Sequence, residues 1–91
     1  MENLIFKIPE NVEWQAIDKG GIILNLETGV YSRVNEMGAK ILSSCDGEKT
    51  LEEIAKEIIS EFEVEKEVAL EDAQSFFENL KSQNLIEVKG G

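Results

Sequence analysis

The chain has 91 residues, enough for one domain with a thin hydrophobic core and too few for a deeply enclosed active site. It carries 19 acidic and 9 basic residues, and this formal net charge of -10 argues against nucleic acid and anionic membranes as partners, because both attract Lys and Arg. With no histidine and one cysteine, the composition excludes a disulfide framework and a His-dependent catalytic triad, and it argues against a structural zinc site.

The amino-terminal residues indicate the compartment. Residues 1–14 show no basic stretch followed by a long apolar one, so no secretory signal is predicted. No apolar run approaches the ~20 residues that span a bilayer. We therefore expect a cytoplasmic protein that has no membrane partner.

The first half of the chain predicts a three-stranded antiparallel meander. Apolar and polar residues alternate in its first segment, and two β-prone runs follow after glycine-containing turns. The strands are expected at 12–18, 22–26 and 30–34, with turns at 19–21 and 27–29. Residues 4–8 are expected to add an extended segment that ends at Pro9.

Capping residues predict the first two of three helices in the second half. Asn35 is a suitable N-cap for the first helix, and residues 46–47 (Asp-Gly) end it, because glycine accepts the left-handed conformation of a helix terminus. Thr50 and Glu53 have the spacing of a capping box, in which each satisfies a backbone N–H of the other.

Apolar residues at helical spacing from Leu70 to Asn84 predict the third helix. Residues 71–72 (Glu-Asp) are expected near its positive N-terminal end. Residues 85–88 predict a short closing strand, and 89–91 are expected to fray.

These elements predict an α+β, winged-helix-like fold, with a three-stranded antiparallel β-meander followed by three α-helices. One domain is expected over 1–91, with its core at about 10–88.

The sequence offers little catalytic chemistry. Cys45 lies on the apolar face near a predicted helix C-terminus beside Asp46, which would raise its pKa, so it is expected to be a core residue rather than a nucleophile. The acidic pairs at 52–53 and 71–72 lie at predicted helix starts, where capping accounts for them. No glycine-rich phosphate loop occurs. We expect no catalytic residue, no cofactor and no metal, and therefore no enzyme.

The third predicted strand has features of a peptide-binding edge. A meander leaves its outer strand unpaired on one side, and 30–34 contains no proline and a single charge, Arg33. A peptide can add to such an edge through main-chain hydrogen bonds. On the third helix, Phe76 points about 100° away from Phe77, so it is expected at the flank of the core, where it either covers the core or lines a groove.

The ordered motifs resemble the PqqD-like family, named for a protein of pyrroloquinoline quinone biosynthesis. The motifs are GVYSRVN at 29–35, GAKIL at 38–42, CDGEKTLEEI at 45–54, EDAQSFFENL at 71–80 and NLI at 84–86. Asn84 stands where the family usually has glycine, a mild departure because Asn also tolerates a left-handed helix end.

The resemblance implies a domain that binds the leader segment of a ribosomally made precursor peptide. Such a domain presents the precursor to a modifying enzyme, often a radical S-adenosylmethionine enzyme. The leader would join the sheet beside the third strand and lie against the third helix. Carried onto this sequence, the contacts would be Val30, Tyr31, Ser32, Arg33 and Val34 from the strand and Asp72, Ala73, Phe76 and Leu80 from the helix.

Two other functions stay open. The alternative is an acidic docking or regulatory module that binds a partner enzyme through Glu52, Glu57 and Glu61. A DNA-binding winged helix suits the fold, but the charge of the helices is wrong for it. In either case we expect a monomer or a weak homodimer, because an open strand edge can pair with its own copy.

Overall fold

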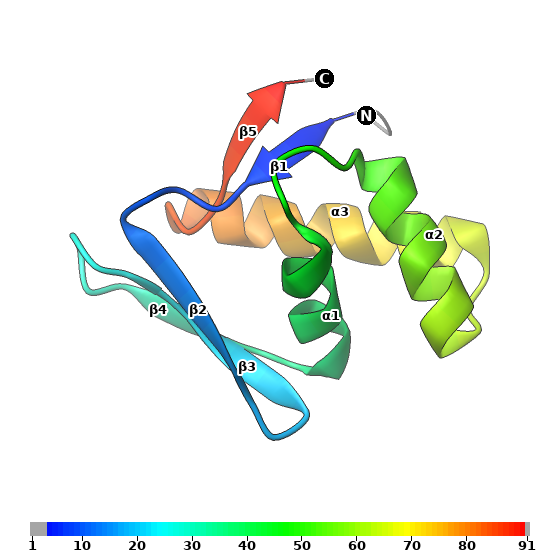
Figure 1. Ribbon diagram of the computed structural model, residues 1–91, viewed down its shortest axis with the longest axis horizontal. Coiled ribbons are helices and arrows are strands. Elements are labelled where there is room, and N and C mark those ends of the chain that lie inside the picture. The colour runs from blue at the N-terminus through cyan, green and yellow to red at the C-terminus, as the bar shows by residue number, and fades with distance from the viewer. Residues whose placement is uncertain (1–3, 91) are drawn as a thin grey trace.

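The computed structural model describes residues 4–90, and within them it has two small antiparallel sheets and three helices (Figure 1). In chain order the elements are β1 (Ile5–Lys7), β2 (Val12–Ile17), β3 (Gly20–Asn25), β4 (Tyr31–Val34), α1 (Glu36–Ser44), α2 (Leu51–Phe62), α3 (Lys66–Ser82) and β5 (Glu87–Gly90). The meander followed by three helices confirms the predicted α+β fold class.

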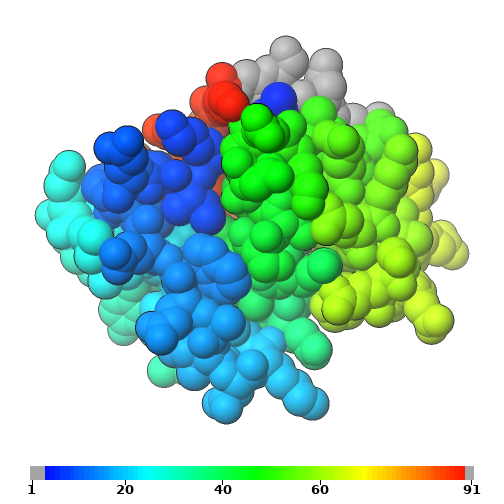
Figure 2. Space-filling view, in the orientation of Figure 1, coloured from blue at the N-terminus to red at the C-terminus, as the bar shows by residue number. Residues whose placement is uncertain are grey.

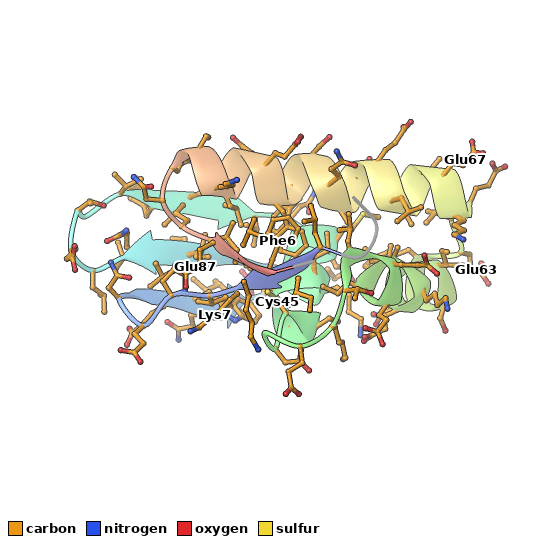
Figure 3. All side chains as sticks on the ribbon, turned by 90° about the horizontal axis from the view of Figure 1, so that it is seen from above. Phe6, Lys7, Cys45, Glu63, Glu67 and Glu87 are labelled. Carbon is orange, nitrogen blue, oxygen red and sulfur yellow. The ribbon has the colours of Figure 1, made fainter. Side chains whose placement is uncertain are left out.

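The meander has the strand order β2-β3-β4. β2 pairs with one side of β3, and β4 pairs with the other side from Gly21↔Val34 to Leu24↔Tyr31. In Figure 3, β4 is the strand of this sheet on the side of α3. The edge of the sheet formed by β4 therefore lies on the side of α3.

The turn between β2 and β3 differs from the prediction. It lies at Asp18 and Lys19, where Asp18 takes the positive φ of 54° that a tight turn requires. Gly20 and Gly21 are the first residues of β3, so the prediction that they form the turn is wrong. The absence of a side chain serves packing instead, because a Cβ on Gly20 would meet the backbone oxygen of Val34.

The two ends of the described chain pair with each other. β1 and β5 form an antiparallel ladder with Phe6 opposite Val88, which brings the amino and carboxyl ends together (Figure 1). The closing strand thus begins two residues later than predicted. Lys89 does not fray: it lies in β5, and its Nζ donates to the carbonyl oxygen of Gly47 at 2.8 Å. Gly91, also predicted to fray, lies outside the described residues.

The predicted N-caps of α1 and α2 are confirmed, but α1 ends at Ser44 with Cys45 as its C-cap, before the predicted end at residues 46–47. The Asn35 side chain accepts a hydrogen bond from the Gly38 N–H at 2.8 Å. The Thr50 hydroxyl accepts from the Glu53 N–H at 3.2 Å, and the Glu53 carboxylate accepts from the Thr50 N–H at 2.9 Å.

α3 begins at Lys66, four residues earlier than predicted. Its N-cap, Glu65, makes no side-chain hydrogen bond, so this end has no capping signature in the sequence. The acidic residue of the first turn is Glu67, and the expectation that residues 71–72 lie near the N-terminal end is wrong. Asn84 takes a left-handed φ of 59°, as its place after the helix predicts.

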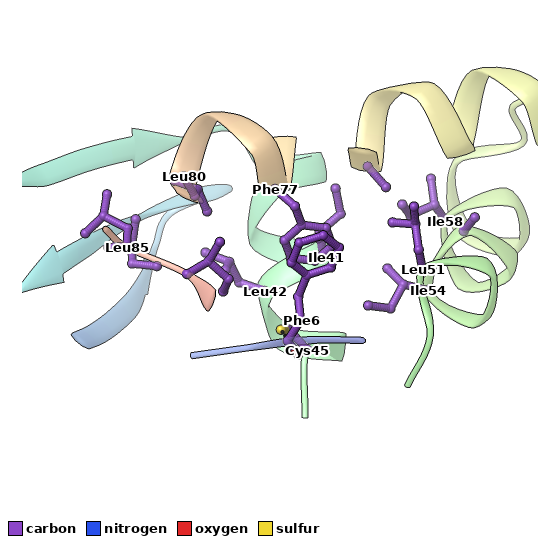
Figure 4. Close-up of a cluster of buried hydrophobic side chains, with 14 of the residues drawn as sticks. Phe6, Ile41, Leu42, Cys45, Leu51, Ile54, Ile58, Phe77, Leu80 and Leu85 are labelled. Carbon is purple, nitrogen blue, oxygen red and sulfur yellow. Dashed lines mark hydrogen bonds between the residues drawn. The ribbon is translucent and has the colours of Figure 1, made fainter. Parts of the chain in front are cut away.

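The core lies where the helices meet the two sheets. Its centre is a stacked aromatic pair, Phe6 from β1 and Phe77 from α3, with ring centroids 4.2 Å apart (Figure 4). Phe6 is 3% exposed, so the amino-terminal strand β1 contributes to this core. On the face shown in Figure 2, residues of β2 lie to one side of α1 and residues of α2 lie to the other.

Candidate functional site

The outer side of β4 is an open strand edge. Within residues 4–90 no strand pairs with it on the side away from β3. The Asn25 N–H donates to the Val30 carbonyl at 2.8 Å. This bond shows which residues of β4 direct their backbone N–H and C=O groups toward β3 and which direct them away from it. Ser32 and every second residue direct their backbone groups toward β3, so the N–H and C=O groups of Tyr31 and Arg33 point outward. These outward groups are what strand addition requires.

The side chains of β4 alternate between two surroundings. Tyr31 is 61% exposed and Arg33 is also exposed, on the outer face of the sheet. Ser32 and Val34 are half-buried on the opposite face. A strand added to this edge would have one row of side chains beside Tyr31 and Arg33 and another row facing the helices.

A groove of about 400 Å³ lies between α1 and α3, where β4 leads into α1. Its apolar surface comes partly from the half-buried Phe76 ring, which also packs edge-on against Phe77. The residues that line the groove are Asn35, Met37, Gly38, Ile41, Asp72, Ser75, Phe76 and Asn79. Phe76 therefore does both things that the sequence left open: it covers the core and it lines a groove.

Gly38 joins the strand end to the groove. A Cβ at this position would lie 2.8 Å from Cε1 of Phe76 and 2.9 Å from Cβ of Val34, closer than ordinary packing allows. The absence of a side chain on Gly38 thus lets α1 approach both the end of β4 and α3.

The structure brings together most of the residues predicted to contact a peptide. Val30 to Val34 lie at the open edge, and Asp72 and Phe76 line the groove. Ala73 and Leu80 do not reach the surface, because they are 0% and 1% exposed. Leu80 points into the core (Figure 4). This corrects the predicted set. The groove face of α3 instead includes Ser75 and Asn79, one helical turn apart.

Asn25 is a supporting residue that the sequence analysis missed. Its buried Oδ1 accepts hydrogen bonds from the N–H groups of Glu27 and Thr28 at 2.9 and 3.0 Å, and its Nδ2 donates to the Asn84 carbonyl at 2.9 Å. It therefore shapes the turn that leads into β4 and ties that turn to the end of α3. The sequence does contain a pattern that could have identified this residue: an Asn at the end of a predicted strand, before a turn with glycine, is typical of an Asx turn.

The charges near the site are unevenly paired. Three lysines pair with glutamates of α2. Lys49 lies 2.9 Å from Glu57, Lys40 lies 3.3 Å from Glu61, and Lys56 lies 3.8 Å from Glu52. The hydrogen bond from Lys49 holds the pKa of Glu57 below its ordinary value. Among the described residues, no salt bridge involves Arg33.

Cys45 is a core residue, as predicted. Burial raises the pKa of its thiol to about 11, with a further contribution from the Asp46 carboxylate. Its Sγ lies 3.3 Å from the Phe6 carbonyl oxygen, to which the S–H donates. A thiol held protonated in this way is a poor nucleophile at neutral pH.

Residues 4–90 contain neither a metal-binding cluster nor a membrane-spanning helix. No group of three or more His, Cys, Asp or Glu side chains in this range is arranged to hold a metal ion. Of the three helices in the same range, none combines the length and the apolar character that crossing a membrane would take.

Comparison with known proteins gives matches over most of the chain. Residues 20–86 match the family model of coenzyme PQQ synthesis protein D (PqqD). A solved structure of TbiB1 in complex with the TbiA(beta) leader peptide is 31% identical, with a TM-score of 0.81, and the match covers 89% of this chain and 94% of that one. No curated protein matches the chain.

A second solved structure, lasso peptide synthetase B1 complexed with the leader peptide, has the same fold. Its TM-score is 0.79 at 23% identity, and the match covers 90% of this chain and 96% of that chain. The likeness extends through nearly the whole of both chains.

Proposed function

The chain belongs to the PqqD family, and from this premise we propose that it is a non-catalytic adaptor for a ribosomally made precursor peptide. It binds the leader segment of the precursor and presents the rest to a modifying enzyme. The outward N–H and C=O groups of Tyr31 and Arg33 are the observation that carries this proposal. The complex of TbiB1 with a leader peptide supports the choice of ligand.

Binding occurs by strand addition at β4. The two outward residues offer two N–H donors and two C=O acceptors, and each hydrogen bond contributes ~0.5–1.5 kcal/mol net. These bonds supply affinity for any extended chain. Specificity comes from the leader side chains, which alternate between the outer sheet face and the groove that Phe76 and Asp72 line.

The adaptor acts through effective concentration. A leader held on the domain keeps the modifiable part of the precursor near the enzyme, so their encounter becomes intramolecular. The family resemblance favours a radical S-adenosylmethionine enzyme as this partner. Since a ribosomally made precursor is synthesised in the cytoplasm, we place the adaptor there too.

The alternative function, docking of a partner through acidic helices, has less support. It relied on three glutamates of α2, and each has a lysine partner within the domain: Lys56 for Glu52, Lys49 for Glu57 and Lys40 for Glu61. Exposed pairs of this kind are weak. Their charge is nevertheless balanced locally, which favours a structural role for these carboxylates.

A comparison of two substitutions at Tyr31 tests the proposal. Both Tyr31→Pro and Tyr31→Val remove the phenol ring, but only proline also removes the outward N–H. Neither change breaks the ladder with β3, because that N–H does not point toward β3. We expect Tyr31→Pro to lower the affinity for a leader peptide about tenfold more than Tyr31→Val does.

The measurement is a titration of isotope-labelled protein with leader peptides of candidate precursors, followed by backbone chemical shifts. We expect saturable shifts confined to β4, the groove face of α3 and the start of α1. Equal affinities of the two Tyr31 variants, or shifts centred elsewhere, would contradict strand addition at this edge.

A further inference from the structure

The outer face of the sheet has a regular arrangement of side chains beside the open edge. Residues opposite each other in an antiparallel pair share a face, so the register aligns Gln15, Ile22 and Arg33 in one row across the sheet. Glu13, Leu24 and Tyr31 form the neighbouring row. A strand added beyond β4 would contribute the next residue to each row.

Arg33 is the side chain that such a residue would meet at the end of its row. It is the only arginine in a chain of net charge -10. Its guanidinium is exposed, and no carboxylate within the described residues forms a salt bridge with it. It borders a hollow of about 300 Å³ with Ile22 and Val34, and Asp18 lines the same hollow without pairing to it.

We propose that Arg33 recognises a carboxylate in the bound leader. The leader then carries Asp or Glu at the position directly opposite Arg33 in the added strand. This inference rests on the proposed function and specifies the chemistry of its ligand.

The geometry favours a paired carboxylate over other side chains. When the leader adds antiparallel to β4, directly opposite residues on one face have Cβ atoms ~4.5–5.5 Å apart, which suits an Arg–carboxylate contact. A guanidinium binds a carboxylate through two parallel hydrogen bonds, a geometry that Lys does not provide. The overall negative charge of the domain repels acidic peptides at long range, so a preference for a carboxylate must come from this local contact.

Selection from a library of random linear peptides tests the inference without knowledge of the natural precursor. The library is selected in parallel against the wild-type domain, Arg33→Glu and Lys66→Glu. The two variants change the net charge equally, but Lys66 begins α3, and its N-terminal end lies far from β4 (Figure 3). Peptides that lose affinity for Tyr31→Pro are taken as ligands of the β4 edge.

We expect the wild-type domain and Lys66→Glu to enrich Asp or Glu at one position of these ligands, and Arg33→Glu to enrich Lys or Arg there. Two synthetic peptides that differ only at this position, one with Glu and one with Lys, provide a direct comparison. The Glu peptide should bind the wild-type domain about tenfold more tightly than the Lys peptide does, and the Lys peptide should bind Arg33→Glu about tenfold more tightly than the Glu peptide does.

Edge ligands with no acidic preference, or with a preference that Arg33→Glu leaves unchanged, overturn the inference while the proposed function stands. If no selected peptide depends on the β4 edge, the proposed function fails and the inference fails with it.

Discussion

Gly38 controls how the candidate groove is shaped, because it has no Cβ to hold the neighbouring side chains apart. The Phe76 ring and the Val34 side chain both occupy space that any larger residue would need. A glycine inside a helix costs ~1 kcal/mol relative to alanine, and here the close approach of α1 to α3 and β4 accounts for its presence.

Gly38→Ala should therefore weaken peptide binding more than it weakens the fold. The ~1 kcal/mol gained in helix propensity offsets part of the ~1–3 kcal/mol cost of overpacking, while the Phe76 ring must move within the groove. Denaturant unfolding and leader titration measure the two effects. The double variant Gly38→Ala, Phe76→Leu is the control, and it should recover part of the stability that Gly38→Ala loses, because it removes the contact with the ring but not the contact with Cβ of Val34.

Cys45 gives a prediction for alkaline pH. Its thiol has an ordinary pKa of 9.0 and a folded-state pKa of about 11, so the folded state favours the protonated form. The corresponding stability is fully present below pH 9 and is lost as the pH rises toward 11. Cys45→Ala, which cannot titrate, should show a smaller loss over this range in unfolding measurements. Equal losses would contradict a protonated buried thiol.

The β3–β4 turn is the element that sets the position of the open edge. Asn25 satisfies two backbone N–H groups of this turn and connects it to Asn84 after α3. The turn, the edge strand and the groove helix are therefore coupled by one buried side chain.

Asn25→Ala should destabilise the domain by ~1–3 kcal/mol, because it leaves buried polar groups without partners. Asn25→Asp keeps the acceptor for Glu27 and Thr28 but loses the donor to Asn84. We expect both variants to lower the unfolding midpoint in urea, and Asn25→Ala also to broaden the resonances of β4. An unchanged midpoint for both would contradict this role.

Local signals in the sequence predicted the meander, the N-caps of α1 and α2 and the order of the elements. The predictions for the N-caps were correct because each cap depends on residues only three positions apart. These residues are Asn35, Thr50 and Glu53. The pairing of β1 with β5 was not predicted, because it joins segments about 80 residues apart and no local motif encodes it.

The residues of α3 that line the groove were only partly predicted for a similar reason. Helical spacing identifies Ala73 and Leu80 as one apolar face with Phe77, but it does not specify whether a groove or the core covers that face. The orientation of α3 on the rest of the domain determines which of its residues are buried. Ala73 and Leu80 face the core, whereas Asp72 and Phe76 line the groove.

The net charge of the whole molecule acts against self-association through its open edge. Two copies of charge -10 repel each other, and the repulsion is screened over ~10 Å at 0.1 M salt and ~3 Å at 1 M. We therefore expect this repulsion to keep the proposed peptide-binding edge from pairing with another copy.

Sedimentation at two salt concentrations tests this balance. We expect a monomer at ~0.1 M salt and weak dimerisation at ~1 M, since screening removes the repulsion but leaves the β4 edge available. Tyr31→Pro should stay monomeric in both. A dimer that persists in Tyr31→Pro would indicate a different contact surface.

The alternating backbone of β4 gives the molecule an internal reporter of occupancy. The amides of Ser32 and Val34 donate to β3, whereas those of Tyr31 and Arg33 face solvent. We therefore expect deuterium uptake along the free strand to alternate between slow and fast from one residue to the next, and a bound peptide to make it slow at every residue of the strand. The amides that are bonded to β3 serve as an internal reference for the neighbouring outward amides. The fraction of protein with bound peptide can therefore be measured within this one strand.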